Sequence, residues 1–459
     1  MTIEPLTTTR LSLATRLLGL LIAIGLTLAG IILSFMQALP VQYIILSAVA
    51  TLAISAWVWR FLASQFVASA AMDGSGLTGS EIRSAWQHHR VGIIGFLILA
   101  GIFAVLSVTV EGFFNIYSVI SVLILLAIVV LTMKFSRYMA ENRSSFIGLM
   151  VLAGLFSVGS MTIEGFASTG NVKSMLVFAS FLGLACVGQT LVALLGGLDL
   201  SIPFVIGAAN VSLLYIIGLG VPPWLALIIV ILVGALLGLI NGILSYRLQG
   251  QALIVTLGMG FAVSGGTQIL TSLGTAYSGN VFGEVPAWLS NLAAMNGTTF
   301  GLEFPAVIAI WAVVALLMIY SLKYTIYGRY LYALGVNRVS ASRVNVSEKA
   351  YWFGVYVFSG TFSAFTGALL LGWSGGGFIG VGDPYLFMTI AAVVVGGTSL
   401  LGGAGGYGFT VIGVLVLQVL TSFLVGLGLE FEWQQFIFGL LILPMVALYA
   451  RSPHIRTLI

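Results

Sequence analysis

Long apolar runs separated by short polar segments make up most of the 459-residue chain. Each run holds roughly 17 to 25 residues, and a helix of that length can cross a hydrocarbon core about 30 Å thick. The pattern predicts about fourteen membrane-spanning helices, at residues 12–35, 40–63, 92–110, 115–133, 145–163, 173–196, 201–219, 223–246, 252–274, 304–322, 351–372, 385–401, 408–428 and 433–450. The twelfth run, 385–401, is interrupted by glycines.

Composition excludes a water-soluble fold. Hydrophobic residues make up 60% of the chain and charged residues only 7%, whereas roughly a quarter of the residues in an ordinary soluble domain are charged. Apolar side chains suit a surface that faces lipid, where charged groups are costly. The sequence therefore predicts an all-α integral membrane protein, a polytopic bundle of about 14 helices.

Basic residues gather on one side of the predicted membrane. If the amino terminus is cytoplasmic, that side carries every lysine and arginine of the chain except Lys173. Cytoplasmic loops are enriched in basic residues, so both termini are predicted to be cytoplasmic. The net charge of +4 then follows from topology, and no nucleic-acid partner is expected.

Part of the chain is duplicated. Residues 90–113 and 143–166 are identical at 13 of 24 aligned positions, and the matches include Arg90 with Arg143 and Glu111 with Glu164. Apolar composition alone does not explain matched charges and glycines. We therefore expect residues 1–140 to form an extra membrane module of about four helices, with a partial copy of the core's first helix. Residues 141–459 would form the core, of about ten helices.

The chain offers no nucleotide-hydrolysing or metal site of its own. It lacks the G-x-x-x-x-G-K-[ST] motif, and its G-x-G-x-x-G pattern at residues 74–79 follows a predicted membrane helix rather than a strand, which favours a linker. Cys186 is the only cysteine, so neither an intrachain disulfide nor a thiolate metal site is expected. No cofactor is expected in this chain, and any ATP hydrolysis must come from another.

A polar element joins two predicted spans, where the sequence is Gly-Gly-Leu-Asp-Leu-Ser over residues 196–201. Asp199 could bind a proton or a cation, because an ionisable residue inside a membrane indicates function. Alternatively, Asp199 or Ser201 could cap the helix that begins at Ile202-Pro203. Gly197, Asp199 and Ser201 are therefore candidates for the transport pathway or for helix packing.

Glycines also break the apolar pattern between Ala391 and Gly406. Such breaks occur in a membrane helix where protein surrounds it, and they often mark a transport path. The candidates here are Gly396, Gly397, Thr398, Ser399, Gly402 and Gly403. Small residues at every fourth position, in 234–242 and in 359–367, predict close helix packing instead.

The segment from Lys323 to Lys349 is the longest charged stretch of the predicted core. Its tyrosines and arginines predict an amphipathic surface helix, which would either lie on the membrane or serve as a docking element.

Several motifs in this order resemble the ribose-type permease family of bacterial ABC sugar importers. The resemblance covers roughly residues 143–451. The motifs are Gly188-Gln189-Thr190-Leu191-Val192, the element 196–201, Gly238-Leu239-Ile240-Asn241-Gly242, Ile254-Val255-Thr256-Leu257-Gly258, Gly328-Arg329-Tyr330-Leu331-Tyr332-Ala333-Leu334-Gly335, residues 391–403 and Trp433-Gln434-Gln435.

The resemblance implies a permease in the bacterial inner membrane. It would pair with a second copy or a paralogue, with cytoplasmic ABC ATPases that use ATP and Mg²⁺, and with a soluble periplasmic solute-binding protein. An ATPase-coupling helix would include Gly328, Arg329, Tyr330, Ala333, Leu334, Gly335 and Arg338. Substitutions at Arg329 or Gly335 are then expected to break coupling without loss of folding. The sequence departs from the family at Ile202-Pro203 and in its four extra spans.

Three alternatives stay open. An ion-coupled secondary transporter would be expected to carry buried carboxylates and an inverted repeat, whereas the repeat found here is parallel. A branched-chain amino-acid-type ABC permease and a non-transporting membrane scaffold or sensor are the other two. The identity of the sugar would reside largely in the binding protein.

Overall fold

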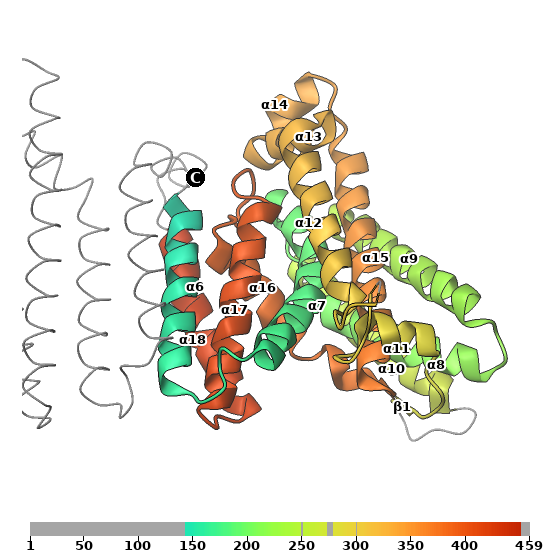
Figure 1. Ribbon diagram of the computed structural model, residues 1–459. Helices are drawn as coiled ribbons and strands as arrows, with labels where there is room; N and C mark the ends of the chain where they lie inside the picture. Colours follow the sequence, from blue (N-terminus) through green and yellow to red (C-terminus); the bar gives the residue numbers. More distant parts are fainter. Residues whose placement is uncertain (1–142, 249–250, 273–278, 300, 451–459) are drawn as a thin grey trace, which may run out of the picture. The chain divides into compact units, whose positions relative to one another are not determined.

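The computed structural model describes residues 143–248, 251–272, 279–299 and 301–450, which are mostly helical (Figure 1). The predicted module 1–140 and the glycine motif within it lie outside the described residues. The helices are α6 (Arg143–Thr162), α7 (Thr169–Leu194), α8 (Ile202–Gly218), α9 (Pro223–Arg247), α10 (Ala252–Ser272), α11 (Ala287–Ala293), α12 (Ala306–Tyr324), α13 (Ile326–Val336), α14 (Arg338–Arg343), α15 (Glu348–Ser374), α16 (Tyr385–Gly396), α17 (Tyr407–Gly426) and α18 (Phe431–Ala450).

The described helices are those of a polytopic all-α membrane protein. Seven segments of the described residues are long and apolar enough to cross a membrane. Each of the apolar runs predicted between residues 143 and 450 corresponds to a helix, within a few residues at either end. The total of about fourteen helices for the whole chain stays a prediction.

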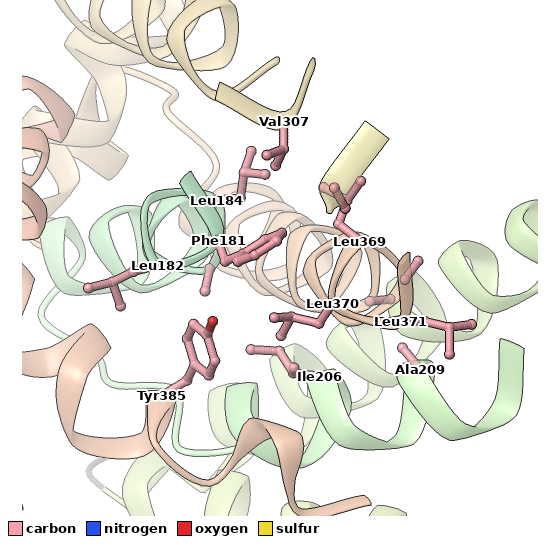
Figure 2. Close-up of a cluster of buried hydrophobic side chains, with 14 of the residues drawn as sticks. Phe181, Leu182, Leu184, Ile206, Ala209, Val307, Leu369, Leu370, Leu371 and Tyr385 are labelled. Atoms are coloured by element: carbon pink, nitrogen blue, oxygen red, sulfur yellow. The ribbon is translucent and has the colours of Figure 1, made fainter. Parts of the chain in front are cut away.

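Helices α7 and α15 form the centre of the described bundle. From Ala179 to Leu194 every residue of α7 is buried, which requires protein rather than lipid on all its sides. Side chains of α7, α8, α15 and α16 point toward one another in this core (Figure 2), among them Phe181, Ile206, Leu370 and Tyr385. The sulfur of Cys186 also lies here, 3.8 Å from the carbonyl oxygen of Thr389.

Glycines bring α9 and α15 into backbone contact, as the small-residue pattern predicted. A Cβ atom on Gly238 would collide with the carbonyl oxygen of Tyr356, and one on Gly360 would collide with that of Gly234. Little hydrophobic effect acts between helices in lipid, so association depends on van der Waals contact at small residues. The prediction of close packing is confirmed for this pair.

The helix in the glycine-rich run 385–401 is shorter than predicted. Helix α16 has 12 residues and ends at Gly396, followed by Gly397 at φ 104°. The short helix η1 (Ile379–Gly382) precedes it. Before η1, the strand β2 (Gly377–Phe378) pairs antiparallel with β1 (Asn280–Val281).

The prediction of an amphipathic helix within residues 323–349 is wrong in detail. Two short helices, α13 and α14, replace it because Asn337 adopts an extended conformation between them. The Asn337 side chain caps α14 by accepting a hydrogen bond from the backbone N–H of Ser340 (2.9 Å). Helices α13 and α14 lie at one end of the described bundle, here called the α13 end, and β1 lies at the other (Figure 1).

The glycine contact between α9 and α15 yields a direct test. We expect Gly238→Ala to destabilise the protein by about 1–3 kcal/mol, because the added methyl group meets backbone that cannot move aside. Gly258→Ala in α10 is the matched control, since Gly258 is exposed with no atom within 4 Å of the added position. Thermal unfolding in detergent measures both. Equal melting temperatures for the two variants would contradict the packing argument.

Candidate functional site

Three segments that the sequence singled out meet at the α13 end. These are α13 itself, the glycine loop (residues 397–406) that joins α16 to α17, and the turn (residues 195–201) that joins α7 to α8. Gly335 brings them together: a Cβ atom there would collide with the carbonyl oxygen of Leu194 and lie 2.5 Å from the nitrogen of Gly403. The nitrogen of Gly403 in turn donates to the carbonyl oxygen of Leu194 (2.9 Å).

The residues of α13 divide into a buried face and an exposed face. Leu331 and Leu334 are buried. Gly328 is also buried and lies against the carbonyl of Leu322, while Thr325 caps the helix by accepting from the N–H of Gly328. The exposed face presents Tyr327, Arg329, Tyr330, Ala333 and Val336.

The predicted coupling residues therefore have different roles. Arg329, Tyr330 and Ala333 can contact a partner, whereas Gly328, Leu334 and Gly335 hold the helix in place. The expectation that Gly335 substitutions leave folding intact does not fit this geometry, because any side chain there displaces backbone. We therefore expect only substitutions at Arg329 to break coupling without loss of folding.

Arg338 fixes the junction between α13 and α14 to two membrane helices. Its guanidinium donates to the carbonyl oxygen of Leu195 after the end of α7 (2.9 Å) and forms an ion pair with Glu348 at the start of α15 (3.2 Å). The group also lies over the ring of Trp352, 4.8 Å from its centroid. This is the only ion pair among the described residues. Sequence reasoning had proposed Arg338 but not its partners, which are distant in sequence.

The glycine loop has backbone conformations that residues with a side chain rarely adopt. Gly397, Gly402, Gly403, Gly405 and Gly406 all have positive φ between 72° and 146°, a region that other residues rarely enter. Gly396, the last residue of α16, lies against the backbone of Phe409 in α17.

Hydrogen bonds close this loop and tie it to α13. Thr398 is buried, and its hydroxyl accepts from the N–H of Gly406 (3.1 Å). The Ser399 hydroxyl accepts from the N–H of Leu401 (3.2 Å). The Tyr332 hydroxyl of α13 donates to the carbonyl of Gly405 (2.7 Å). Burial raises the pKa of Tyr332 above its ordinary value, which already lies well above neutral pH, so the hydroxyl is a donor there.

Asp199 lies buried within the turn, with a set of hydrogen-bond donors around its carboxylate. Oδ1 accepts from the backbone N–H of Ser201 (3.0 Å) and from its hydroxyl (2.6 Å), and Oδ2 accepts from the hydroxyl of Ser359 in α15 (2.7 Å). Of the two predicted caps, the one by Ser201 is not formed, because its side chain makes no capping hydrogen bond to α8, while Asp199 accepts from the N–H of Ser201, the residue before that helix. The Ser201 hydroxyl donates to Asp199 instead. Gly197 lies nearby, against Val192 and Tyr356.

The two ends of the described bundle differ in charge. Basic side chains at the α13 end are Arg247, Lys323, Arg329, Arg338, Arg343 and Lys349. Exposed carboxylates at the β1 end are Glu164, Glu284, Glu303, Asp383, Glu430 and Glu432. Lys173 is the one basic side chain described at that end, and it donates to the backbone carbonyl of Glu303 (3.2 Å).

Comparison with known proteins identifies the class. The family model described as the permease component of branched-chain amino acid transport systems matches residues 171–446, more than half of the chain. The chain belongs to this family of membrane permeases.

Two of the similar relatives are named as import permeases for a particular sugar. The ribose import permease of Haemophilus influenzae is 32% identical over 316 residues, which cover 68% of this chain and 94% of the relative. The fructose import permease of Bifidobacterium longum is 30% identical over an aligned region that covers 65% of this chain and 87% of the relative. A probable ABC transporter permease of Escherichia coli is 32% identical, with coverage of 65% and 87%. No solved structure matches the chain.

The contacts of Arg338 can be tested without a partner protein. We expect Arg338→Gln to lower the free energy of unfolding by about 1–3 kcal/mol, because a charged hydrogen bond to a backbone carbonyl is lost together with the ring contact. The matched control is Arg343→Gln on α14, whose exposed side chain has no partner among the described residues, and it should stay within about 0.5 kcal/mol of the parent. Equal effects would show that Arg338 does not fasten the junction.

Proposed function

We propose that this chain is the membrane-spanning permease subunit of a bacterial ABC importer that translocates a sugar or a sugar-like solute. The observation that carries the proposal is the similarity to ribose and fructose import permeases across nearly the whole length of those relatives. Two copies, or this chain and a paralogue, would enclose the pathway in the inner membrane. The solute would arrive on a soluble periplasmic binding protein.

The driving force would come from separate cytoplasmic ATPases that hydrolyse ATP with Mg²⁺. We place their docking surface on the exposed face of α13. Arg329 and Tyr330 would contact the ATPase there, while the buried face rests on the glycine loop and on the end of α7. The basic residues of the α13 end support a cytoplasmic location for that end, with both chain termini also cytoplasmic.

The anchoring of α13 supplies a route from the ATPase to the pathway. A displacement of α13 would act on α7 through Gly335 and Arg338, on α15 through Glu348 and Trp352, and on the start of α17 through Tyr332. A bound ATPase can change the permease only by contacting its two conformations differently. The short rigid contacts around α13 are suited to carry such a difference to three membrane helices together.

We further propose that residues 141–459 form a core of about ten helices and that residues 1–140 are an added module of about four. The parallel repeat between 90–113 and 143–166 supports this division. The module would then extend a permease whose pathway it does not itself form.

Transport in reconstituted vesicles decides the general proposal. The chain, its co-purified ATPase and its binding protein should import labelled ribose or fructose with ATP and Mg²⁺ but not without them. Transport on an ion gradient alone, in vesicles free of any ATPase, would overturn the proposal. Uptake of leucine in place of either sugar would redirect it to branched-chain amino acids.

The docking surface has its own test. We expect Arg329→Glu to reduce ATP-driven transport at least about tenfold while leaving thermal unfolding unchanged, because the exposed side chain has no partner within the described residues. Arg247→Glu is the control, since Arg247 is an exposed arginine at the same end but on α9. Equal losses in both variants would point to charge in general and would contradict docking at α13.

A further inference from the structure

An apolar groove with a volume of about 450 Å³ is lined by α6, α7 and α17. Helices α6 and α17 lie side by side (Figure 1), with Gly148 of α6 packed against Ile412 of α17. Nine of the ten residues that line the groove are apolar, among them Phe156 of α6 and Met175 of α7, and the tenth is Gln418 of α17. The groove has no part in the function proposed above.

Gln418 is buried in the wall of this groove without a partner for its amide. The side chain is 7% exposed, and within the described residues it forms no hydrogen bond. The next polar side chains along α17 bond elsewhere: Thr421 donates to the carbonyl oxygen of Leu417 (2.9 Å), and Ser422 donates to Asn171 (3.2 Å). A buried amide without a partner is costly, so an occupant of the groove should supply one.

Neither lipid nor water has the chemistry that the groove requires. An acyl chain fits the apolar walls but offers the amide no hydrogen bond. The ester groups of a phospholipid lie at the edge of the hydrocarbon core, whereas Gln418 lies eight residues before Gly426 at the end of α17, about 12 Å along the helix. A water molecule needs two or more polar partners and would find only Gln418. A helix with an apolar face and one hydroxyl at this depth meets both requirements.

The chain itself has a predicted helix next to this groove. The span predicted at 115–133 is followed by nine residues, 134–142, before α6 begins at Arg143. Nine residues reach at most about 30 Å, and connections this short usually join antiparallel neighbours. A helix that ends at residue 133 is therefore expected beside α6, which forms one wall of the groove.

We propose that residues 119–133, which lie outside the described residues, occupy the groove, and that the Ser121 hydroxyl is the hydrogen-bond partner of Gln418. Among residues 119–133, only Ser121 and Thr132 have polar side chains. Ser121 lies six residues from the predicted start of the span at Asn115, about 9 Å along a helix. That depth agrees with the position of Gln418 below the same end of the membrane, whereas Thr132 lies near the opposite end.

A disulfide cross-link tests the proposal. The one native cysteine, Cys186, is buried, so a pair of introduced thiols can be oxidised selectively. The test variant is Ser121→Cys with Gln418→Cys, and the control is Thr132→Cys with Gln418→Cys. Thr132 lies eleven residues from Ser121, about 16 Å along a helix, whereas a disulfide requires Cα atoms within about 7 Å. Both variants carry a specific protease site within 134–142 and are cleaved after oxidation in native membranes.

The outcome is read on a non-reducing gel. We expect at least about tenfold more joined fragments from the test variant than from the control, because only Ser121 reaches disulfide distance. Before cleavage, the cross-linked protein must run as a single chain. A disulfide-linked dimer would assign the groove to a second copy and overturn the proposal, and so would fragments that separate in both variants. Import by the assembled transporter is tested separately in the vesicle assay.

A double-mutant cycle covers the case in which a cysteine at position 418 prevents folding. The variants are Gln418→Leu, Ser121→Ala and both together, assayed by thermal unfolding in detergent. A hydrogen bond between the two side chains makes the shift of the double variant differ from the sum of the single shifts. The shifts of Gln418→Leu with Thr132→Val should add. Additive shifts in both pairs would overturn the proposal.

Discussion

Backbone contact between helices is the constraint on which the other features depend. In lipid, apolar side chains gain little by leaving one apolar surface for another, so helices are held by close packing and by internal hydrogen bonds. Gly188, Gly234, Gly238 and Gly360 remove the side chains that would keep α7, α9 and α15 apart. Only at that separation can Ser359 of α15 donate to the Asp199 carboxylate and Asn241 of α9 donate to the Ser201 hydroxyl, which itself donates to that carboxylate. The polar interior is therefore a product of the glycine pattern.

Close backbone contact also holds the segments at the α13 end together. Helix α13 packs against glycine residues and backbone carbonyls, and Arg338 connects its end to α15 through the ion pair with Glu348. A helix fastened in this way cannot tilt independently of the helices beneath it. Under the docking proposed above, a partner that displaces α13 would also displace the ends of three membrane helices.

Hydropathy alone predicted most of the fold, because lipid leaves a spanning segment few options besides a long helix. The charged stretch 323–349 and the glycines between residues 391 and 406 located α13 and the glycine loop. These patterns missed the break at Asn337, where a local cap competes with helix continuation, and the early end of α16 at Gly397. Pairings such as Arg338 with Glu348 and Trp352, or Asp199 with Ser359, depend on the three-dimensional crossing of helices and have no local pattern. The motifs at 188–192 and 238–242 contain Gln189 and Asn241, but no local pattern predicts that these side chains bond to Asp199 and Ser201 of the turn.

The burial of Cys186 has a practical consequence for experiment. The sulfur is fully enclosed between α7 and α16, and the sequence holds no second thiol. A cysteine introduced on an exposed position such as Ala333 would therefore be the one group that a maleimide dye or spin label reaches in the folded protein. The natural chain already serves as the background for distance measurements across the transport cycle.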